Sequence, residues 1–197
     1  MAKNNPRGLV ASRTMGSNVP ARQKQYPTGA RNLTQIFTGD LVFLDANGEV
    51  QSFTGVSADA RPALGVVAHV LDSNRKPMTH SLPTKAAFLD ASTAGFVSVY
   101  DDPDTVFVVH SSAAVTQANT GSFTTVTANS PNSAAGISGQ MMGAIVATAA
   151  GHPLQILGIS EEETETTAGG GIANNDVEVK ISNHLFRRSA RLIPAVE

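Results

Sequence analysis

Five histidines are the residues of this chain best suited to acid–base or metal chemistry, and they are scattered singly along it. No two of them stand two or four residues apart, the spacings that would place both on one face of a strand or a helix. Zero cysteines exclude disulfides, cysteine-ligated zinc, iron–sulfur clusters and thiol catalysis. We therefore expect packing, turn or surface roles for all of them: His69, His80, His110, His152 and His184.

Three aspartates around Pro103 form the one carboxylate group with the character of a metal site. Calcium takes several oxygen ligands from a short loop, and Asp101, Asp102 and Asp104 supply three carboxylates close together. The segment lacks the spaced Asp/Asn pattern and the distal Glu of a calcium-binding hand. Aspartate and proline also favour tight turns. We interpret the segment as a turn and predict no metal site.

The glycine-rich and acidic segments do not form a catalytic motif. Glu161–Glu165 holds four glutamates that would repel one another, which indicates a solvated loop. Gly169–Gly171 is not followed by the Lys-Ser/Thr pair of a phosphate-binding loop, and Gly136–Gly139 lacks the spacing of a nucleophile elbow. We predict that the chain is not an enzyme and needs no cofactor.

Charge is distributed unevenly along the 197 residues. Residues 1–39 carry six cations and no acid, residues 40–180 carry fifteen acids against five cations, and residues 181–197 carry three cations and one acid. A chain with basic ends and an acidic body is suited to binding through its ends. The candidate binding residues are the arm cations Arg7, Arg13, Arg22, Lys24 and Arg31, with Arg187, Arg188 and Arg191 as secondary contributors.

A protein surface is a better candidate partner for these cations than nucleic acid is. The cations are mostly widely spaced, only Tyr26 is near them for stacking on a base, and the acidic body would repel the polymer. No stretch approaches the length of an apolar membrane helix, and the first residues contain no signal-like apolar segment. We expect a soluble, unexported protein that binds neither nucleic acid nor membrane.

Composition and apolar periodicity divide the chain into three parts. Three prolines and three glycines with no apolar periodicity predict an extended arm without a core of its own, although an ordinary frayed terminus explains the same composition. The predicted parts are a basic N-terminal arm over residues 1–32, a β-domain over 33–186 with a mobile loop at about 160–175, and a basic C-terminal tail over 187–197.

Short β-prone runs separated by turns fill the middle of the chain. The Asn47-Gly48 pair between two such runs is a strong hairpin signal. The apolar run 63–71 fits a strand buried on both faces, although its period also fits a short helix. Further strands are expected at 96–100 and 105–110 as a second hairpin, at 140–149, at 153–159 and at 177–181, with a short helix within 111–120 and mostly loop over 124–139. This pattern predicts a mainly β fold, an antiparallel sandwich or barrel with at most one short helix.

The order of these segments resembles tailed-bacteriophage capsid cement or decoration proteins. The resemblance is carried by Phe37–Leu44 with its Asn-Gly turn, Pro62–Ala68, Val97–Phe107, Leu154–Ile159 and Val177–His184. It implies a virion structural protein on the outer surface of a phage head, made in the cytoplasm of the host bacterium. Such a protein forms a homo-oligomer, a dimer or trimer, and bridges subunits of the major capsid protein. No catalytic residues are implied.

Two other functions compete with this expectation. A receptor- or glycan-binding β-domain on the virion surface, or the base of a head fibre, would make contact through the loop at 160–175. Sugar binding favours exposed aromatic residues, but the chain has no Trp and two Tyr. A β-barrel enzyme of nucleotide metabolism would need a phosphate-binding motif or a paired acid and base, and the sequence contains neither.

Overall fold

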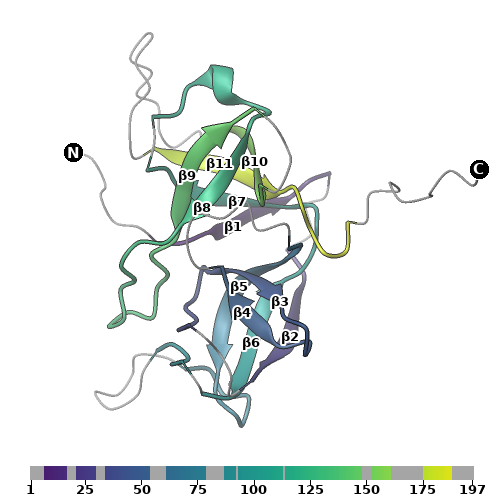
Figure 1. Ribbon diagram of the computed structural model, residues 1–197, viewed down its shortest axis with the longest axis vertical. Coiled ribbons are helices and arrows are strands. Elements are labelled where there is room, and N and C mark those ends of the chain that lie inside the picture. The colour runs from purple at the N-terminus through teal and green to yellow at the C-terminus, as the bar shows by residue number, and fades with distance from the viewer. Residues whose placement is uncertain are drawn as a thin grey trace, which may run out of the picture.

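The computed structural model describes residues 7–16, 21–29, 34–53, 61–78, 87–91, 93–112, 114–147, 152–160 and 175–187. Within them the chain forms two antiparallel sheets (Figure 1). The upper sheet in Figure 1, called sheet A, has the order β1 (Val10–Thr14), β7 (Thr105–His110), β11 (Asp176–Ile181), β10 (Leu154–Ile159), β8 (Phe123–Thr127), β9 (Met141–Val146). The lower sheet, called sheet B, has the order β2 (Gln23–Thr28), β6 (Gly95–Tyr100), β5 (Ala63–Leu71), β3 (Leu41–Leu44), β4 (Val50–Ser52). The predicted mainly β, antiparallel sandwich is confirmed.

One hydrophobic core joins the two sheets. Phe107 on β7 is completely buried at its centre and lies edge-on to Tyr100 at the end of β6. Leu41 and Val66 of sheet B and Val179 of sheet A belong to the same cluster. Burial of this apolar surface is the main force that holds the sheets together.

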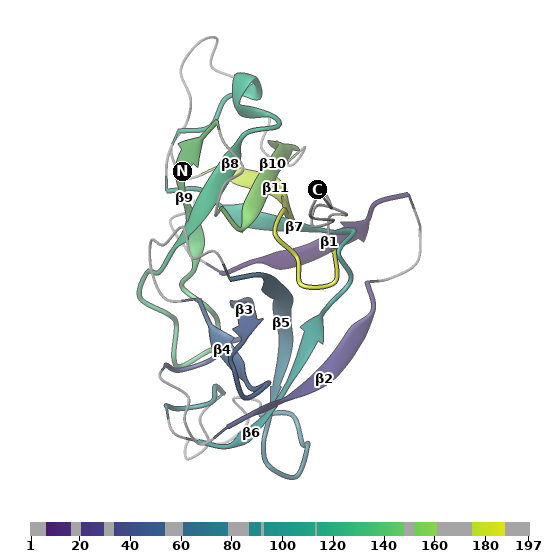
Figure 2. The same cartoon turned by 45° about the vertical axis from the view of Figure 1, so that its right-hand side comes forward.

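Sheet B buries its other face as well. Val42, Leu64 and Val99 lie in a second cluster, together with Tyr26 of β2. The two edge strands of this sheet approach each other, because Gly29 after β2 packs against the carboxylate of Glu49 before β4. Sheet B therefore curls around its own core, as the turned view shows (Figure 2).

Two sequence expectations in sheet B are confirmed in detail. Strands β3 and β4 form the hairpin around Asn47-Gly48, where Gly48 adopts a positive φ of 76° and Asp45 Oδ1 accepts hydrogen bonds from the Asn47 and Glu49 backbone amides. The run 63–71 is strand β5, rather than a short helix, and all of its residues except His69 are buried. It is buried on both faces because one face meets sheet A and the other lines the second cluster.

The N-terminal arm is extended as expected, but its described residues are not separate from the β-domain. Strand β1 pairs with β7, with Val10 opposite Val108, and strand β2 pairs with β6, with Gln23 opposite Tyr100. Residues 7–16 and 21–29 thus supply an edge strand to each sheet. Pro27 is compatible with this position because an edge strand need not donate on both sides. The predicted arm without a core of its own is corrected for these two segments.

The second expected hairpin is also wrong, although both of its strands exist. Strand β6 pairs with β2 and β5 in sheet B, whereas β7 pairs with β1 and β11 in sheet A. The turn Asp101–Asp104 therefore carries the chain from one sheet to the other. Both strands are largely buried, and a buried β-branched run gives no signal about which neighbour it pairs with.

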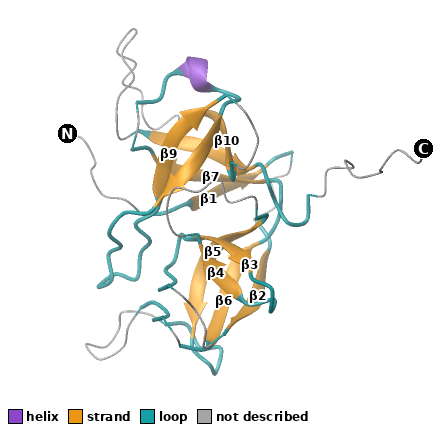
Figure 3. Ribbon diagram, in the orientation of Figure 1, coloured by secondary structure: helices purple, strands orange, loops and turns teal. Residues whose placement is uncertain are grey.

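The segment between the expected helix and β9 contains more regular structure than its sequence suggests. Residues 123–127 form β8, where mostly loop was expected from residue 124 on, and Phe123 and Thr124 pair with both β9 and β10. The short helix is a single 3-10 turn at Gln117–Asn119 (Figure 3). No helix in the described part of the chain is long and apolar enough to cross a membrane.

Candidate functional site

The candidate binding cations that the structure describes lie beside partners from their own chain. Four arginines pair with acids: Arg7 with Asp176 at 2.5 Å, Arg13 with Glu178, Arg22 with Asp101 at 3.5 Å, and Arg187 with Asp104 at 3.0 Å. Lys24 Nζ lies 5.2 Å from the centre of the Tyr26 ring. Arg31, Arg188 and Arg191 fall outside the described residues. The basic ends thus neutralise part of the acidic body directly.

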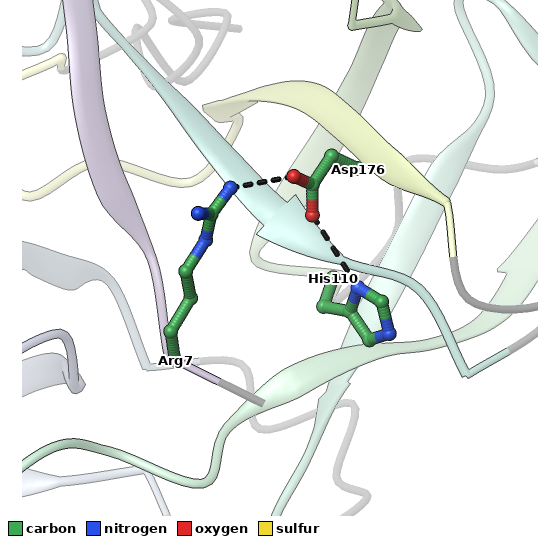
Figure 4. A network of polar contacts seen from close by, with 3 residues as sticks. All are labelled: Arg7, His110 and Asp176. Atoms are coloured by element: carbon green, nitrogen blue, oxygen red, sulfur yellow. Dashed lines mark hydrogen bonds and ion pairs between the residues drawn. The ribbon is translucent and has the colours of Figure 1, made fainter. Parts of the chain in front are cut away.

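Arg7, in the segment before β1, belongs to a network with His110 at the end of β7 and Asp176 at the start of β11 (Figure 4). One carboxylate oxygen of Asp176 accepts a hydrogen bond from Arg7, and the other lies 3.3 Å from His110 Nδ1. Asp176 and His110 are both buried. A buried carboxylate is stabilised when charged and polar groups surround it in this way.

The contact between His110 and Asp176 resembles the histidine–carboxylate pair of a catalytic triad. A triad also needs a nucleophile within hydrogen-bond reach of the other imidazole nitrogen. Among the described residues, His110 Nε2 is buried and has no hydrogen-bond partner. The geometry therefore supports a structural link between the segment before β1 and strands β7 and β11.

The Asp101–Asp104 segment is a turn whose carboxylates point to different partners. Asp101 is buried and accepts a hydrogen bond of 2.7 Å from the Tyr26 hydroxyl, while Asp102 Oδ1 accepts one from the Asp104 backbone amide. Burial, followed by the contact with Asp101, raises the pKa of Tyr26 well above its ordinary range. No cluster of three or more His, Asp or Glu side chains in the described ranges is arranged to hold a metal ion.

His184 lies near this turn. It is buried, and its Nδ1 accepts a hydrogen bond of 3.1 Å from the Phe186 backbone amide. Burial lowers the pKa of His184, and the nearby aspartates only partly offset that effect. The bond from the Phe186 amide and a backbone bridge to Ala63 help to hold the end of the described chain against sheet B.

Asp40 is the centre of a buried polar cluster that the sequence did not reveal. Its Oδ1 accepts a hydrogen bond of 2.5 Å from the Ser138 hydroxyl, and its Oδ2 accepts 3.0 Å bonds from the Phe37 amide and the Ser52 hydroxyl. The side chain is only 3% exposed. Burial raises the pKa of Asp40 to about 6, against the opposing effect of these hydrogen bonds.

Gln140 extends this cluster across the sheet interface. Its side-chain oxygen accepts from the Leu41 amide, and its side-chain nitrogen donates to the Phe53 carbonyl and the Ser52 hydroxyl. Ser138 and Gln140 precede β9 of sheet A, whereas Leu41 and Ser52 belong to sheet B. The cluster therefore fastens the two sheets together through hydrogen bonds as well as apolar packing.

Asp40 should make stability depend on pH in a defined direction. Its folded-state pKa is above the ordinary value, so its contribution is full below about 4 and is lost as the pH rises through about 6. We expect the free energy of unfolding of the native chain, relative to Asp40→Asn, to fall by about 2 kcal/mol between pH 4 and pH 7. Urea denaturation of both proteins measures this difference, and a constant difference over that range would contradict it.

A groove of about 590 Å³ crosses the outer face of sheet A next to β1. Val10, Val108 and Ile159 give it an apolar part, and the Arg13–Glu178 pair gives it a charged wall.

Sequence reasoning found the cations but missed most of their partners. Asp176 and Glu178 stand two residues apart on β11, a spacing that places both on one face of a strand, and this was the available signal. Asp40 and Ser138 are ninety-eight positions apart, and nothing local connects them. No protein-family model, curated protein or solved structure matches this chain.

Proposed function

We propose that the protein is a virion structural protein, a cement or decoration protein that binds the outer surface of a tailed-phage head. It would act as a homo-oligomer, a dimer or trimer, and bridge subunits of the major capsid protein so that the shell resists internal pressure. The observation that carries the proposal is the resemblance over residues 33–186. The segments that carry the resemblance contain strands β3, β5, β6, β7, β10 and β11.

A body that carries load between capsid subunits must not separate into its two sheets. Several features of this chain oppose such separation: the shared core around Phe107, the Asp40 cluster, and the N-terminal segment that contributes a strand to each sheet. These features support a mechanical role, because each of them joins segments of the two sheets that are far apart in the sequence.

Attachment to the shell would then depend on area and repetition more than on single charges. Arg13 and Arg22 have side chains that are 54% and 72% exposed, yet each already lies beside an acid of its own chain. Exposed ion pairs contribute about 0–1 kcal/mol each. An oligomer that meets a repeating lattice at several points gains effective concentration, so modest contacts add up to firm binding.

Co-sedimentation with purified, undecorated heads tests the proposal directly. The full chain should pellet with the heads, saturate at a fixed ratio to the major capsid protein, and appear as added density outside the shell by electron microscopy. Heads that bind no protein at concentrations well above micromolar, while a sample of the same chain is folded, would overturn the proposal.

The charge contribution can be separated from fold stability at one pair. Arg13→Glu alone places two acids side by side in space. The double variant Arg13→Glu with Glu178→Arg restores an ion pair with the two charges exchanged. We expect both variants to bind heads within about fivefold of the native chain, since an exposed pair is worth no more than about 1 kcal/mol. A loss of a hundredfold or more in both, with unchanged melting temperatures, would make Arg13 a principal capsid contact and contradict this distribution of binding energy.

A further inference from the structure

His184 holds the end of the described chain through one nitrogen of its imidazole. The Nδ1 atom accepts a hydrogen bond of 3.1 Å from the Phe186 backbone amide. A ring nitrogen that accepts a hydrogen bond carries no proton, so the proton of the neutral ring lies on Nε2. Phe186 itself is 52% exposed, and its ring is only tilted against the imidazole at a distance of 5.8 Å. The position of Phe186 therefore depends on an unprotonated Nδ1.

A buried carboxylate with incomplete hydrogen bonding lies near the same imidazole. Asp101 acts on His184 more strongly than any other charged group does. Its Oδ2 accepts from the Tyr26 hydroxyl, whereas its Oδ1 is buried, lies 3.5 Å from Arg22 Nε and has no hydrogen-bond partner among the described residues. His184 Nε2 is also buried without a partner in this part of the chain. An unpaired buried acceptor is costly, so a further donor at Asp101 would be stabilising.

We propose that His184 is an acid-sensitive latch, which holds Phe186 while Nδ1 is unprotonated and releases it when Nδ1 takes a proton from solvent. The added proton turns Nδ1 from an acceptor into a donor, so two N–H groups face each other and the bond to Phe186 is lost. The resulting imidazolium is stabilised by the Asp101 carboxylate. Leu185 stays in place, because its amide donates to the Ala63 carbonyl at 2.7 Å. This inference does not depend on the proposed capsid role.

The groups around His184 decide in which direction the latch works. Burial lowers the pKa of His184, the aspartates of the nearby turn oppose that effect, and Arg187 adds to it. The latch is therefore closed at neutral pH and opens below the ordinary histidine range, which lies at about pH 6.5. The titratable and charged groups near the ring are Asp101, Asp102, Asp104 and Arg187, with Tyr26 and Arg22 in contact with Asp101, and Arg61 two residues before the Ala63 that bridges to His184.

Nuclear magnetic resonance of the full chain between about pH 7.5 and about pH 4.5 tests the latch. We expect the ring-nitrogen chemical shifts to place the single proton of His184 on Nε2 at neutral pH. As His184 takes its second proton, the protection of the Phe186 amide from hydrogen exchange, corrected for the intrinsic effect of pH, should fall about tenfold with the same midpoint. The amide of Val179, in the interior strand β11, should keep its protection over this range.

Two variants control for other titrating groups, including Asp40. His184→Asn keeps an acceptor at the position of Nδ1 but does not titrate, so the protection of the Phe186 amide should then be independent of pH. Asp101→Asn keeps an acceptor for the Tyr26 hydroxyl while it removes the charge. We expect this variant to open the latch at lower pH, because the imidazolium loses its carboxylate. An unchanged midpoint would contradict the part assigned to Asp101.

Three results would overturn the latch as a whole. A proton found on Nδ1 at neutral pH would contradict the starting state. Protection of the Phe186 amide that does not change while His184 titrates would mean that the ring does not hold it. An equal loss of protection in the native chain and in His184→Asn would assign the loss to another group. If His184→Asn does not fold, the position of the proton and the coincidence of the two midpoints in the native chain still decide between the outcomes.

Discussion

A chain that begins at residue 33 is expected to lose its folded structure or to aggregate. The deletion removes β1 and β2, one edge strand from each sheet, together with the buried side chains of Leu9 and Tyr26. It also leaves Asp176 without Arg7 and Asp101 without the Tyr26 hydroxyl. A buried acid that loses its partner costs several kcal/mol, a large share of the stability of a typical domain.

The same deletion exposes two strands rich in valine. Strands β6 and β7 would become sheet edges, and exposed apolar edges promote aggregation. Circular dichroism and sedimentation of the shortened chain measure both effects. Removal of residues 1–6 alone is the matched control, because it keeps both strands. A shortened chain that is soluble and melts cooperatively within a few degrees of the native protein would contradict the structural role of the N-terminal segment.

Phe107→Ala is expected to be the most damaging single substitution at the interface between the sheets. Phe107 is completely buried and contacts residues from both sheets in the shared core. Truncation of a buried phenylalanine costs about 3–5 kcal/mol, because transfer energy is lost and a cavity remains. Urea denaturation, followed by a probe of each sheet, measures the loss.

A conservative variant separates the cavity from other effects. Phe107→Leu retains most of the buried volume and should cost under about 1.5 kcal/mol. If both substitutions cost less than 1 kcal/mol, the two sheets do not depend on this core, and the sandwich described above would be incorrect in its central contact.

The strands with strong local signals were predictable from the sequence. Asn47-Gly48 requires a backbone geometry that suits a two-strand turn, so the β3–β4 hairpin could be placed within a residue or two. The run that became β5 could be recognised because burial on both faces removes polar positions. In both cases the information lies in adjacent residues.

Pairing between distant segments was not predictable in this way. Strand β2 contains Lys24, Gln25 and Pro27, and only its alternate residues Tyr26 and Thr28 are buried, so a short polar edge strand looks like an extended arm. The assignment of β6 and β7 to different sheets depends on partners far away in the chain. A local pattern carries no information about such partners.

The candidate site divides along the same line. The excess of cations at the chain ends is a property of composition and was visible at once. Their partners Asp101, Asp176 and Glu178 became known only from the packing of β1 and β2 against β6, β7 and β11. The acids that face these cations lie between 79 and 169 positions away in the sequence, so the pairing could not be seen locally. For this reason the cations suggested binding to an external surface.

Limited trypsin digestion of the native full chain tests most directly whether the basic N-terminal segment is part of the body. Arg13 lies in β1 and Lys24 lies in β2, while Lys180 in the interior strand β11 serves as an internal reference. The structure predicts that cleavage after Arg13 and Lys24 does not precede loss of the folded domain, and that a urea-unfolded sample is cut rapidly at all three positions. Early release of a stable folded body beginning at residue 14 or 25 would contradict it.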